Sequence, residues 1–284
     1  MKIAVLGTGL MGSAFGRVLL AGGTDLTVWN RTAEKADALV ELGAARADSV
    51  SEAVAANDVV LMLVLDQPTV RDALKGLDLT GKTIVNYTTG TGADALTAEE
   101  LVTSAGGRYI DAVIPAYPAD IGKRDTMIYY AGDHEAYGKL SEPFGLLSGL
   151  KPFVGRQVGN ANVLDAAWVG GFHCIAVGGF HEAASFALGE GVTIDTMSDS
   201  IDYYLGLLRK ILLESVEAIR SGEFGTDQAT LDTYIQGIAS CRQTMVDAGE
   251  RAELISANLA SLERASAAGH GDASLYTQYL TMRS

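Results

Sequence analysis

The segment "KIAVLGTGLMG" (2–12) is the most informative part of the 284-residue sequence for the fold. An apolar run typical of a β-strand is followed by glycines at the spacing G-x-G-x-x-G, and a helix-like stretch comes next. Glycines at this spacing permit a tight turn and a close approach of the backbone, so a pyrophosphate can lie on the helix N-terminus. The motif directly after the first strand therefore predicts a dinucleotide-binding site. Its predicted cofactor-binding residues are Gly7, Gly9, Leu10, Met11 and Gly12.

The end of the second predicted strand, "LTVW" (26–29), indicates which dinucleotide binds. NAD sites usually place Asp or Glu about 20 residues after the glycines, where it binds the ribose 2′-hydroxyl. Here the position is the neutral Asn30, followed by Arg31 and Thr32, with Lys35 shortly after. A guanidinium can bind a 2′-phosphate through two hydrogen bonds, and a threonine hydroxyl can donate to it. These four residues are therefore predicted to bind the cofactor, which we predict to be NADPH.

Residues 1–155 alternate strand-like with helix-like stretches. The first four strand-like runs are continuously apolar, which is typical of strands covered on both faces of a parallel sheet. The predicted strands are 2–7, 26–29, 58–65, 82–87, 109–114, 127–132 and 151–155.

After Gly155 the strand pattern ends, and helical patterns follow, separated by glycines typical of C-caps and turns. The predicted helices are 161–189, 194–220, 226–248, 251–268 and 274–282. The predicted fold class is α/β, with an N-terminal Rossmann domain, a long interdomain helix and an all-α C-terminal domain. The predicted boundaries are 1–158 for the NADP-binding domain, 159–189 for the helix and 190–284 for the C-terminal substrate and dimerisation domain.

Two further segments, "LVLDQ" (63–67) and "NYTTGT" (86–91), lie at the carboxyl ends of predicted strands. Ligands of open α/β sheets bind at this edge. The two threonine hydroxyls are expected to face the nicotinamide end of the cleft. The cofactor-binding residues predicted from these segments are Leu63, Val64, Leu65, Thr88 and Thr89.

The composition limits the class of partner. A hydrophobic content of 48% with 20% charged residues is typical of a folded protein. The net charge of −14 argues against a nucleic-acid partner, because phosphate binding needs a basic face. Cys174 and Cys241 form no disulfide framework and suit a reducing compartment. We predict a cytoplasmic protein without a signal peptide, a metal site or a nucleic-acid partner.

The segment 163–188 is long and apolar, but charged and polar residues such as Asp165 and His173 interrupt it. A helix buried in protein is therefore favoured over a membrane span. A carboxylate among apolar residues needs either a structural partner or a function, because burying an unpaired charge is costly.

Taken together, these segments resemble the β-hydroxyacid dehydrogenase superfamily and, within it, the imine reductases and reductive aminases. The matching segments are "GTGLMG" (7–12), "WNRT" (29–32), "NYTTGT" (86–91), "DAVIPAYPADIG" (111–122), the helix start 159–165, "ATLD" (229–232) and "AGHGD" (268–272). The resemblance implies NADPH-dependent reduction of imines or iminium ions to amines, with reductive amination of a ketone by an amine as a further reaction. It also implies a C-terminal domain like that of 6-phosphogluconate dehydrogenase, and a domain-swapped homodimer. A long apolar helix, poorly covered by one small helical domain, favours such a dimer.

One position separates this chain from the hydroxyacid dehydrogenases that it resembles. Those enzymes carry a catalytic lysine six residues after the glycine that opens the long helix, and the same count from Gly159 leads to Asp165. An aspartate repels an acid substrate and favours a cationic iminium. The resemblance thus implies a catalytic Asp165, which either donates a proton to the imine nitrogen or stabilises the iminium as a carboxylate. A helix aspartate paired with some structural donor is the alternative.

The second predicted catalytic residue is His173, about 12 Å along an α-helix from Asp165 and roughly 80° around it, so both can border one cavity. A packed, structural histidine is the alternative. The predicted substrate-pocket residues are Thr89, Tyr117, Trp168, Phe172 and Gln236. "GHGD" (269–272) is typical of a glycine-capped turn, and the resemblance implies that it lies near the active site without assigning it a role.

Two alternatives to an imine reductase remain open from the sequence. One is a β-hydroxyacid dehydrogenase-like carbonyl reductase, against which Asp165 argues. The other is a catalytically silent NADPH-binding protein, which binds the cofactor without oxidising it in the presence of an imine.

Overall fold

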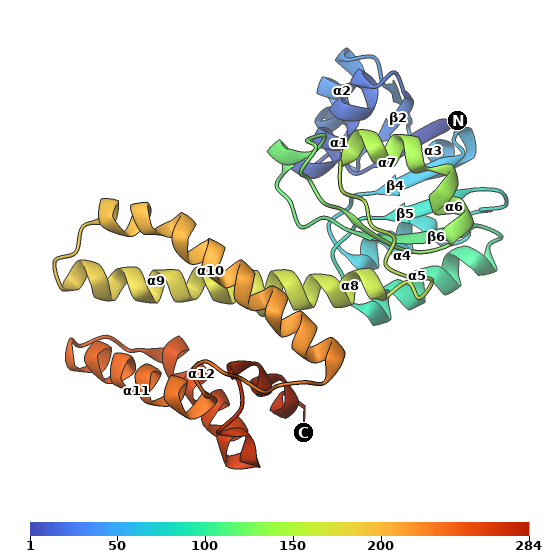
Figure 1. The fold of residues 1–284 in the computed structure, drawn as a ribbon. Coiled ribbons are helices and arrows are strands. Elements are labelled where there is room, and N and C mark those ends of the chain that lie inside the picture. The colour runs from blue at the N-terminus through green and yellow to red at the C-terminus, as the bar shows by residue number, and fades with distance from the viewer. Residues whose placement is uncertain (284) are drawn as a thin grey trace. The chain divides into compact units, whose positions relative to one another are not determined.

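The computed structural model describes residues 1–283, which divide into two compact units (Figure 1). The first unit is Met1–Phe172, and the second begins at His173. The division falls inside the predicted interdomain helix 159–189. Each unit is described by itself.

The first unit contains a seven-stranded sheet of order β3-β2-β1-β4-β5-β6-β7. All neighbouring strands are parallel except β6 and β7, which are antiparallel. This topology confirms the predicted Rossmann fold. The strands are β1 (Lys2–Leu6), β2 (Asp25–Trp29), β3 (Ala45–Arg46), β4 (Val59–Met62), β5 (Thr83–Asn86), β6 (Arg108–Val113) and β7 (Tyr129–Gly132).

Two strand predictions need correction. The predicted strand 151–155 is wrong, because only the isolated bridge Tyr130–Phe153 forms within it, next to a second bridge, Met127–Leu150. Pro152 has no N–H to donate, and Gly155 turns the chain away at a φ of 134°. Conversely, β3 was not predicted, since its two residues are exposed and carry no apolar pattern.

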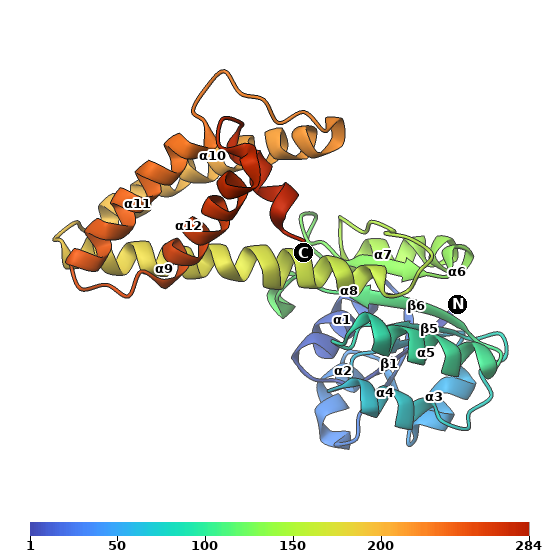
Figure 2. The same ribbon diagram turned by 90° about the horizontal axis from the view of Figure 1, so that it is seen from below.

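Helices cover both faces of this sheet, as Figures 1 and 2 show. Successive residues of β1 point to opposite faces: Ile3 and Val5 enter one buried cluster, and Ala4 and Leu6 enter the other. The first cluster packs under α1, α2, α6 and α7, and the second packs under α3, α4 and α5. The helices and helical turns of this unit are α1 (Leu10–Ala21), η1 (Ala33–Ala36), α2 (Asp37–Glu41), α3 (Val50–Ala56), α4 (Gln67–Leu74), α5 (Gly92–Ser104), η2 (Pro118–Asp120), α6 (His134–Lys139) and α7 (Ser141–Leu147).

The long helix is not a uniform α-helix. It consists of α8 (Asn160–Asp165), a π-helical segment η3 (Ala166–His173) and α9 (Cys174–Gly189). By length and composition this helix could cross a membrane. Within residues 1–283, η3 has no buried residue and α9 has only Ala184, so the burial of this helix in protein stays a prediction that depends on a partner chain.

The second unit is helical and has a small core. Leu231, Leu262 and Ala265 are its buried cluster. The predicted helix start at 226 is five residues too early, because Thr230 caps the helix by accepting a hydrogen bond from the backbone N–H of Thr233. Its other elements after α9 are α10 (Ile194–Ser221), α11 (Leu231–Asp247), α12 (Glu253–Ala265), the π-helical turn η4 (Ser266–His270) and the 3₁₀ segment η5 (Leu275–Thr281).

Candidate active site

The turn after β1 needs each of its glycines for a different reason. Gly7 has a φ of 98°, and a Cβ on it would lie 2.3 Å from the carbonyl oxygen of Leu63. A Cβ on Gly12 would lie 1.8 Å from the carbonyl oxygen of Gly7, so only glycine allows α1 to start this close to the strand. Gly9 has nothing within 4 Å of its Cβ position. Its backbone therefore borders open space at the N-cap of α1, which is where a pyrophosphate binds in such turns.

Asn30 has a structural role that the sequence did not reveal. Its Oδ1 accepts a hydrogen bond from the backbone N–H of Thr8 at 3.0 Å. Its Nδ2 donates to the carbonyl oxygen of Thr32 at 2.9 Å. The residue thus links the glycine turn to the loop that carries Arg31.

A groove of about 480 Å³ runs from the glycine turn to this loop. It contains no carboxylate and has the cations Arg31 and Lys35 at its rim, which suits a 2′-phosphate. Hydrogen bonds from Thr69 lower the pKa of Asp66, and the nearby charge of Arg31 adds to this effect. The groove brings together twelve of the predicted cofactor residues: Gly7, Gly9, Leu10, Met11, Gly12, Asn30, Arg31, Thr32, Lys35, Leu63, Val64 and Leu65. Trp29 and Thr69 also line it and were not predicted.

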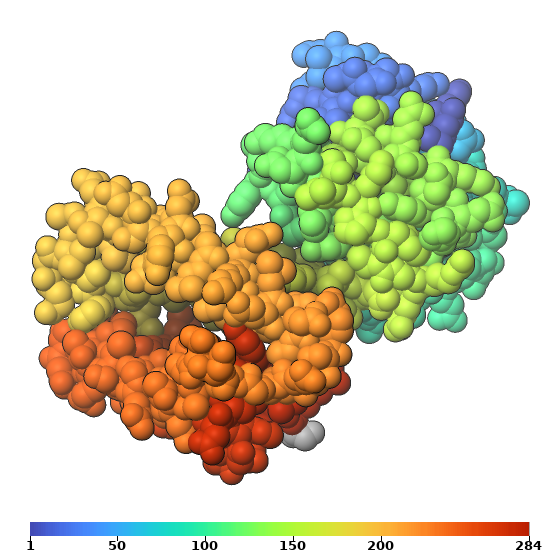
Figure 3. Space-filling view, viewed as in Figure 1, coloured from blue at the N-terminus to red at the C-terminus, as the bar shows by residue number. Residues whose placement is uncertain are grey.

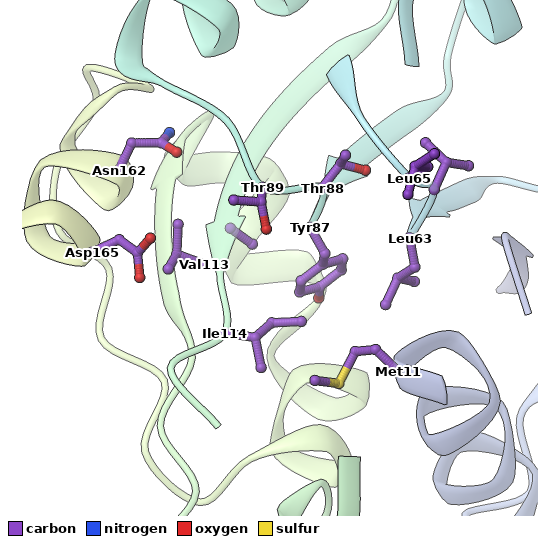
Figure 4. A pocket seen from close by; sticks show the side chains of 12 residues that line it. Met11, Leu63, Leu65, Tyr87, Thr88, Thr89, Val113, Ile114, Asn162 and Asp165 are labelled. Carbon is purple, nitrogen blue, oxygen red and sulfur yellow. The ribbon is translucent and has the colours of Figure 1, made fainter. Parts of the chain in front are cut away.

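A second cavity, of about 240 Å³, adjoins the groove, because Met11, Leu63, Val64 and Leu65 line both. Asp165 projects into it from α8, opposite Met11 of α1 (Figure 4). The predicted residues Thr88 and Thr89 line its wall. The lining residues that the sequence analysis missed are Tyr87, Ala112, Val113, Ile114 and Asn162. The resemblance covers 111–122 as a segment, but no pattern identifies which of these side chains face a cavity.

The Asp165 carboxyl has no structural partner among residues 1–283, where it forms neither an ion pair nor a side-chain hydrogen bond. Partial burial raises its pKa above the usual range for an aspartate. An unpartnered carboxyl in a cavity wall is free to exchange a proton with a ligand. This observation counts against the structural aspartate.

The other predicted catalytic and pocket residues do not line this cavity. Tyr117 is 77% exposed at the start of η2. Trp168 and Phe172 pack edge to face within η3, with ring centroids 5.5 Å apart. Gln236 lines a separate cavity in the second unit.

His173 is exposed and is the first residue of the second unit. The predicted angle of roughly 80° between Asp165 and His173 assumed 3.6 residues per turn, which does not hold in this segment. The intervening segment is π-helical, with bonds from i to i+5.

The segment 269–272 packs against the start of α11 within the second unit. The backbone N–H of Asp232 donates to the carbonyl oxygen of Gly271 at 3.1 Å. The Asp232 carboxylate accepts from the hydroxyl of Ser266 at 2.6 Å. A Cβ on Gly271 would lie 2.5 Å from the same carboxylate. Two of the segments that carry the resemblance, "ATLD" and "AGHGD", are therefore in direct contact.

Comparisons with known proteins agree with this architecture. Residues 2–155 match the NAD binding domain of 6-phosphogluconate dehydrogenase, and residues 157–284 match the NADPH-dependent reductive aminase-like C-terminal domain. The chain is 32% identical to an NADPH-dependent reductive aminase of Aspergillus oryzae, over 95% of this chain and 92% of that protein.

Two solved structures are similar over nearly the whole chain. An imine reductase from Pseudomonas sp. superposes with a TM-score of 0.91 at 30% identity and covers 99% of both chains. A reductive aminase from Aspergillus terreus, solved with cyclohexanone and allyl amine, superposes with a TM-score of 0.89 at 27% identity and covers 99% of both chains.

Proposed function

This chain belongs to the family of NADPH-dependent reductive aminases and imine reductases, and from that premise we propose that it reduces imines or iminium ions to amines. The observation that carries the proposal is the unpartnered Asp165 carboxyl in a cavity that adjoins the cofactor groove. NADPH, when bound, supplies the hydride that is added to the C=N carbon.

The groove residues hold the cofactor in this proposal. The N-terminus of α1, bordered by Gly9, binds the pyrophosphate. Arg31, Thr32 and Lys35 bind the 2′-phosphate through charge-assisted hydrogen bonds. Thr88 and Thr89 lie at the nicotinamide end.

Asp165 acts on the nitrogen of the substrate. In its protonated form it donates to a neutral imine, so that the nitrogen carries positive charge when the carbon is reduced. In its ionised form it stabilises an iminium that is already charged. Partial burial raises the pKa of Asp165, which makes its protonated form more accessible than that of an exposed aspartate, as the first role requires. His173 remains a proposed second participant, with Tyr117, Trp168, Phe172 and Gln236 as proposed pocket residues.

The substrate is a small imine, either supplied as such or formed from a ketone and an amine. The Aspergillus terreus relative solved with cyclohexanone and allyl amine supports the second source. A cavity of about 240 Å³ beside the groove suits a small substrate.

We also propose that the enzyme is a cytoplasmic, domain-swapped homodimer in which the helical domain supplies the substrate and dimer contacts. Ile175, Val177 and Phe180 of α9 are exposed in the single chain. α10, with only Ala218 buried, lies along the visible surface in Figure 3. Such apolar faces need a cover, and a second copy of the chain supplies one. Sedimentation should give about twice 29.7 kDa.

The experiment that tests the function follows NADPH oxidation with 2-methyl-1-pyrroline, with a ketone plus an amine, and with small ketoacids. Imine-dependent oxidation with an amine product supports the proposal. Oxidation with ketoacids alone would indicate the carbonyl reductase. Tight NADPH binding without oxidation by any of these substrates would indicate a silent binding protein.

A further inference from the structure

A second aspartate lies buried behind the cavity wall and has no part in the proposed chemistry. Asp111 of β6 is 2% exposed and forms no ion pair within residues 1–283. Its carboxyl accepts a hydrogen bond from Nδ2 of Asn162, and the neighbouring hydroxyl of Tyr109 acts to lower its pKa. Burying an acidic group without an ion pair is costly, so its hydrogen bond to Asn162 constrains where both side chains lie.

The bond to Asn162 connects two parts of the chain that are 51 residues apart. Asn162 is 9% exposed and lines the cavity together with Asp165. The two residues are three positions apart in α8, so their side chains lie on the same face of the helix. A shift of Asn162 along or away from β6 would therefore move the Asp165 carboxyl as well.

Tyr109, two residues before Asp111 in β6, points to the same face of the sheet and is linked to another lining residue of the cavity, Thr88. The hydroxyl of Tyr109 accepts from Nδ2 of Asn86 at 3.0 Å. Oδ1 of Asn86 accepts from the backbone N–H of Thr88 at 3.0 Å. Hydrogen bonds thus link Thr88 through Asn86 to Tyr109, whose hydroxyl neighbours the Asp111 carboxyl that holds Asn162.

The beginning of α8 is held close to α5 by a second contact. A Cβ on Gly159 would lie 3.0 Å from Cα of Gly92, the first residue of α5. Nδ2 of Asn160 also donates to the carbonyl oxygen of Val154 at 3.1 Å. With the N-terminus of α8 held in this way, the Asp111–Asn162 bond determines how its first turn is rotated toward the cavity.

We propose that Asp111 is a positioning residue, which through Asn162 sets where the Asp165 carboxyl stands in the cavity. The inference rests on the proposed imine reduction for its effect on turnover. The claim that Asp111 positions the Asp165 carboxyl through Asn162 does not depend on which reaction the protein catalyses. No contact between Asp111 and a substrate is required.

The test is a double-mutant cycle of Asp111→Asn, Asn162→Ala and the combined variant. Above about pH 7 the Asp111 carboxyl is ionised and only accepts, whereas Asp111→Asn puts an NH2 group in place of one acceptor oxygen, so turnover of a neutral cyclic imine at that pH should fall about ten- to a hundredfold. The Michaelis constant and NADPH affinity should change little. If Asp111 acts through Asn162, the same substitution in the Asn162→Ala background should cost almost nothing more. Independent, additive losses would overturn the proposal.

A titration of Asp165 by carboxyl ¹³C NMR on the cofactor-free protein provides a readout that does not depend on activity. Both single variants should bring the pKa of Asp165 back toward its usual value, because the loosened turn exposes the carboxyl to water. An unchanged pKa would mean that Asp111 only stabilises the fold. If Asp111→Asn does not fold, Asn162→Ala removes the same bond from the other side and is measured alone.

Asp133→Ala is the matched control. Asp133 caps α6 by accepting from the backbone N–H of Ala136 at 2.9 Å, away from the cavity. Its loss should lower the melting temperature but leave turnover and the Asp165 titration unchanged. If the wild type showed no imine-dependent NADPH oxidation, the proposed function would be overturned. The NMR titration of Asp165 in the wild type and the variants would still test whether Asp111 positions the Asp165 carboxyl.

Discussion

Asn30 accepts a hydrogen bond from the backbone N–H of Thr8 at 3.0 Å and so ties the carboxyl end of β2 to the glycine turn after β1. NAD sites usually carry an acid at this position. Here the neutral amide also donates to the carbonyl oxygen of Thr32, which no carboxylate can do. The residue that we propose to distinguish NADPH from NADH thus also shapes the loop that carries Arg31.

Asn30→Asp should lower the preference for NADPH over NADH by about tenfold or more, since a like charge near the 2′-phosphate is worth on the order of 1.4 kcal/mol or more. The new carboxylate still accepts from Thr8, so the turn should persist. The ratio of kcat/KM for the two cofactors is the measurement. Asn30→Ala, which loses both hydrogen bonds, should weaken both cofactors similarly. An unchanged ratio in Asn30→Asp would contradict a 2′-phosphate site here.

Arg31→Ala should raise the Michaelis constant for NADPH much more than that for NADH. Loss of a charge-assisted hydrogen bond costs about 1.5–3 kcal/mol, which corresponds to roughly ten- to a hundredfold. Steady-state kinetics with both cofactors measure the difference. Arg220→Ala is the control, because Arg220 pairs with Glu217 in the second unit. Equal effects of Arg31→Ala on both cofactors would rule out the assigned role.

Gly9→Ala should weaken NADPH binding, whereas Gly12→Ala should lower the stability of the fold. The Cβ on Gly12 would lie 1.8 Å from the carbonyl oxygen of Gly7, so this variant should lose about 1–3 kcal/mol of stability or more. The Cβ on Gly9 meets no atom within 4 Å and enters open space, so its melting temperature should hold while NADPH binding weakens. Thermal unfolding and cofactor titration separate the two effects. Full NADPH affinity in Gly9→Ala would argue against a pyrophosphate at this turn.

Asp165→Asn and Asp165→Ala should both lower turnover of a neutral imine, by about 10²- to 10⁴-fold if the carboxyl acts as a general acid. NADPH binding should be nearly unchanged. In the wild type, turnover of a neutral imine should fall as the pH rises through the raised pKa of Asp165, because the protonated form is lost.

A permanently charged N-alkyl iminium is the control substrate for Asp165. It needs no proton, so its reduction should suffer less in both variants. Equal losses on the two substrates would indicate electrostatic stabilisation in place of proton donation. A lower melting temperature with normal turnover in the two variants would indicate that Asp165 has a structural role.

Because of Asp111, the free energy of unfolding should fall as the pH rises. Burial raises its pKa to about 7 in the folded chain, against an ordinary value of 3.8, while hydrogen bonds from Tyr109 and Asn162 act in the opposite direction. Tyr109, which shares its strand, and Glu99 of α5, whose charge acts on Tyr109, are the titratable groups around it. Between these two pKa values the folded state binds more protons than the unfolded state. The contribution of Asp111 to the free energy of unfolding is therefore fully present below the unfolded pKa and is lost as the pH rises through about 7.

Urea unfolding at a series of pH values measures this effect. From about pH 4 to 7 the wild type should lose on the order of 4 kcal/mol relative to Asp111→Asn. Relative to Asp78→Asn, the wild type should instead gain stability as the pH rises, because hydrogen bonds from Thr80 lower the pKa of Asp78 in the folded chain. Parallel curves for wild type and Asp111→Asn would mean that Asp111 is not protonated in the folded chain near neutral pH.

Local sequence patterns were sufficient for the features that depend on neighbouring residues. The glycine spacing after β1, the buried strands and the helix caps each depend on a few consecutive positions, and these patterns led to the Rossmann fold and to the residues that line the groove. The same patterns failed where an element depends on a distant partner. Residues 151–155 are strand-like in composition but make one isolated bridge, and η3 has the composition of any apolar α-helix.

The contacts that build the candidate site join residues far apart in the chain. The Asn30–Thr8 bond spans 22 residues and the Asn162–Asp111 bond spans 51, and both depend on which strands lie side by side and in what register. A side chain's hydrogen-bond partner follows from that register, which a linear pattern does not contain. The identity of Asp165 pointed to a carboxyl with a function, but only packing of α8 against β6 gave it a cavity, no partner and a raised pKa.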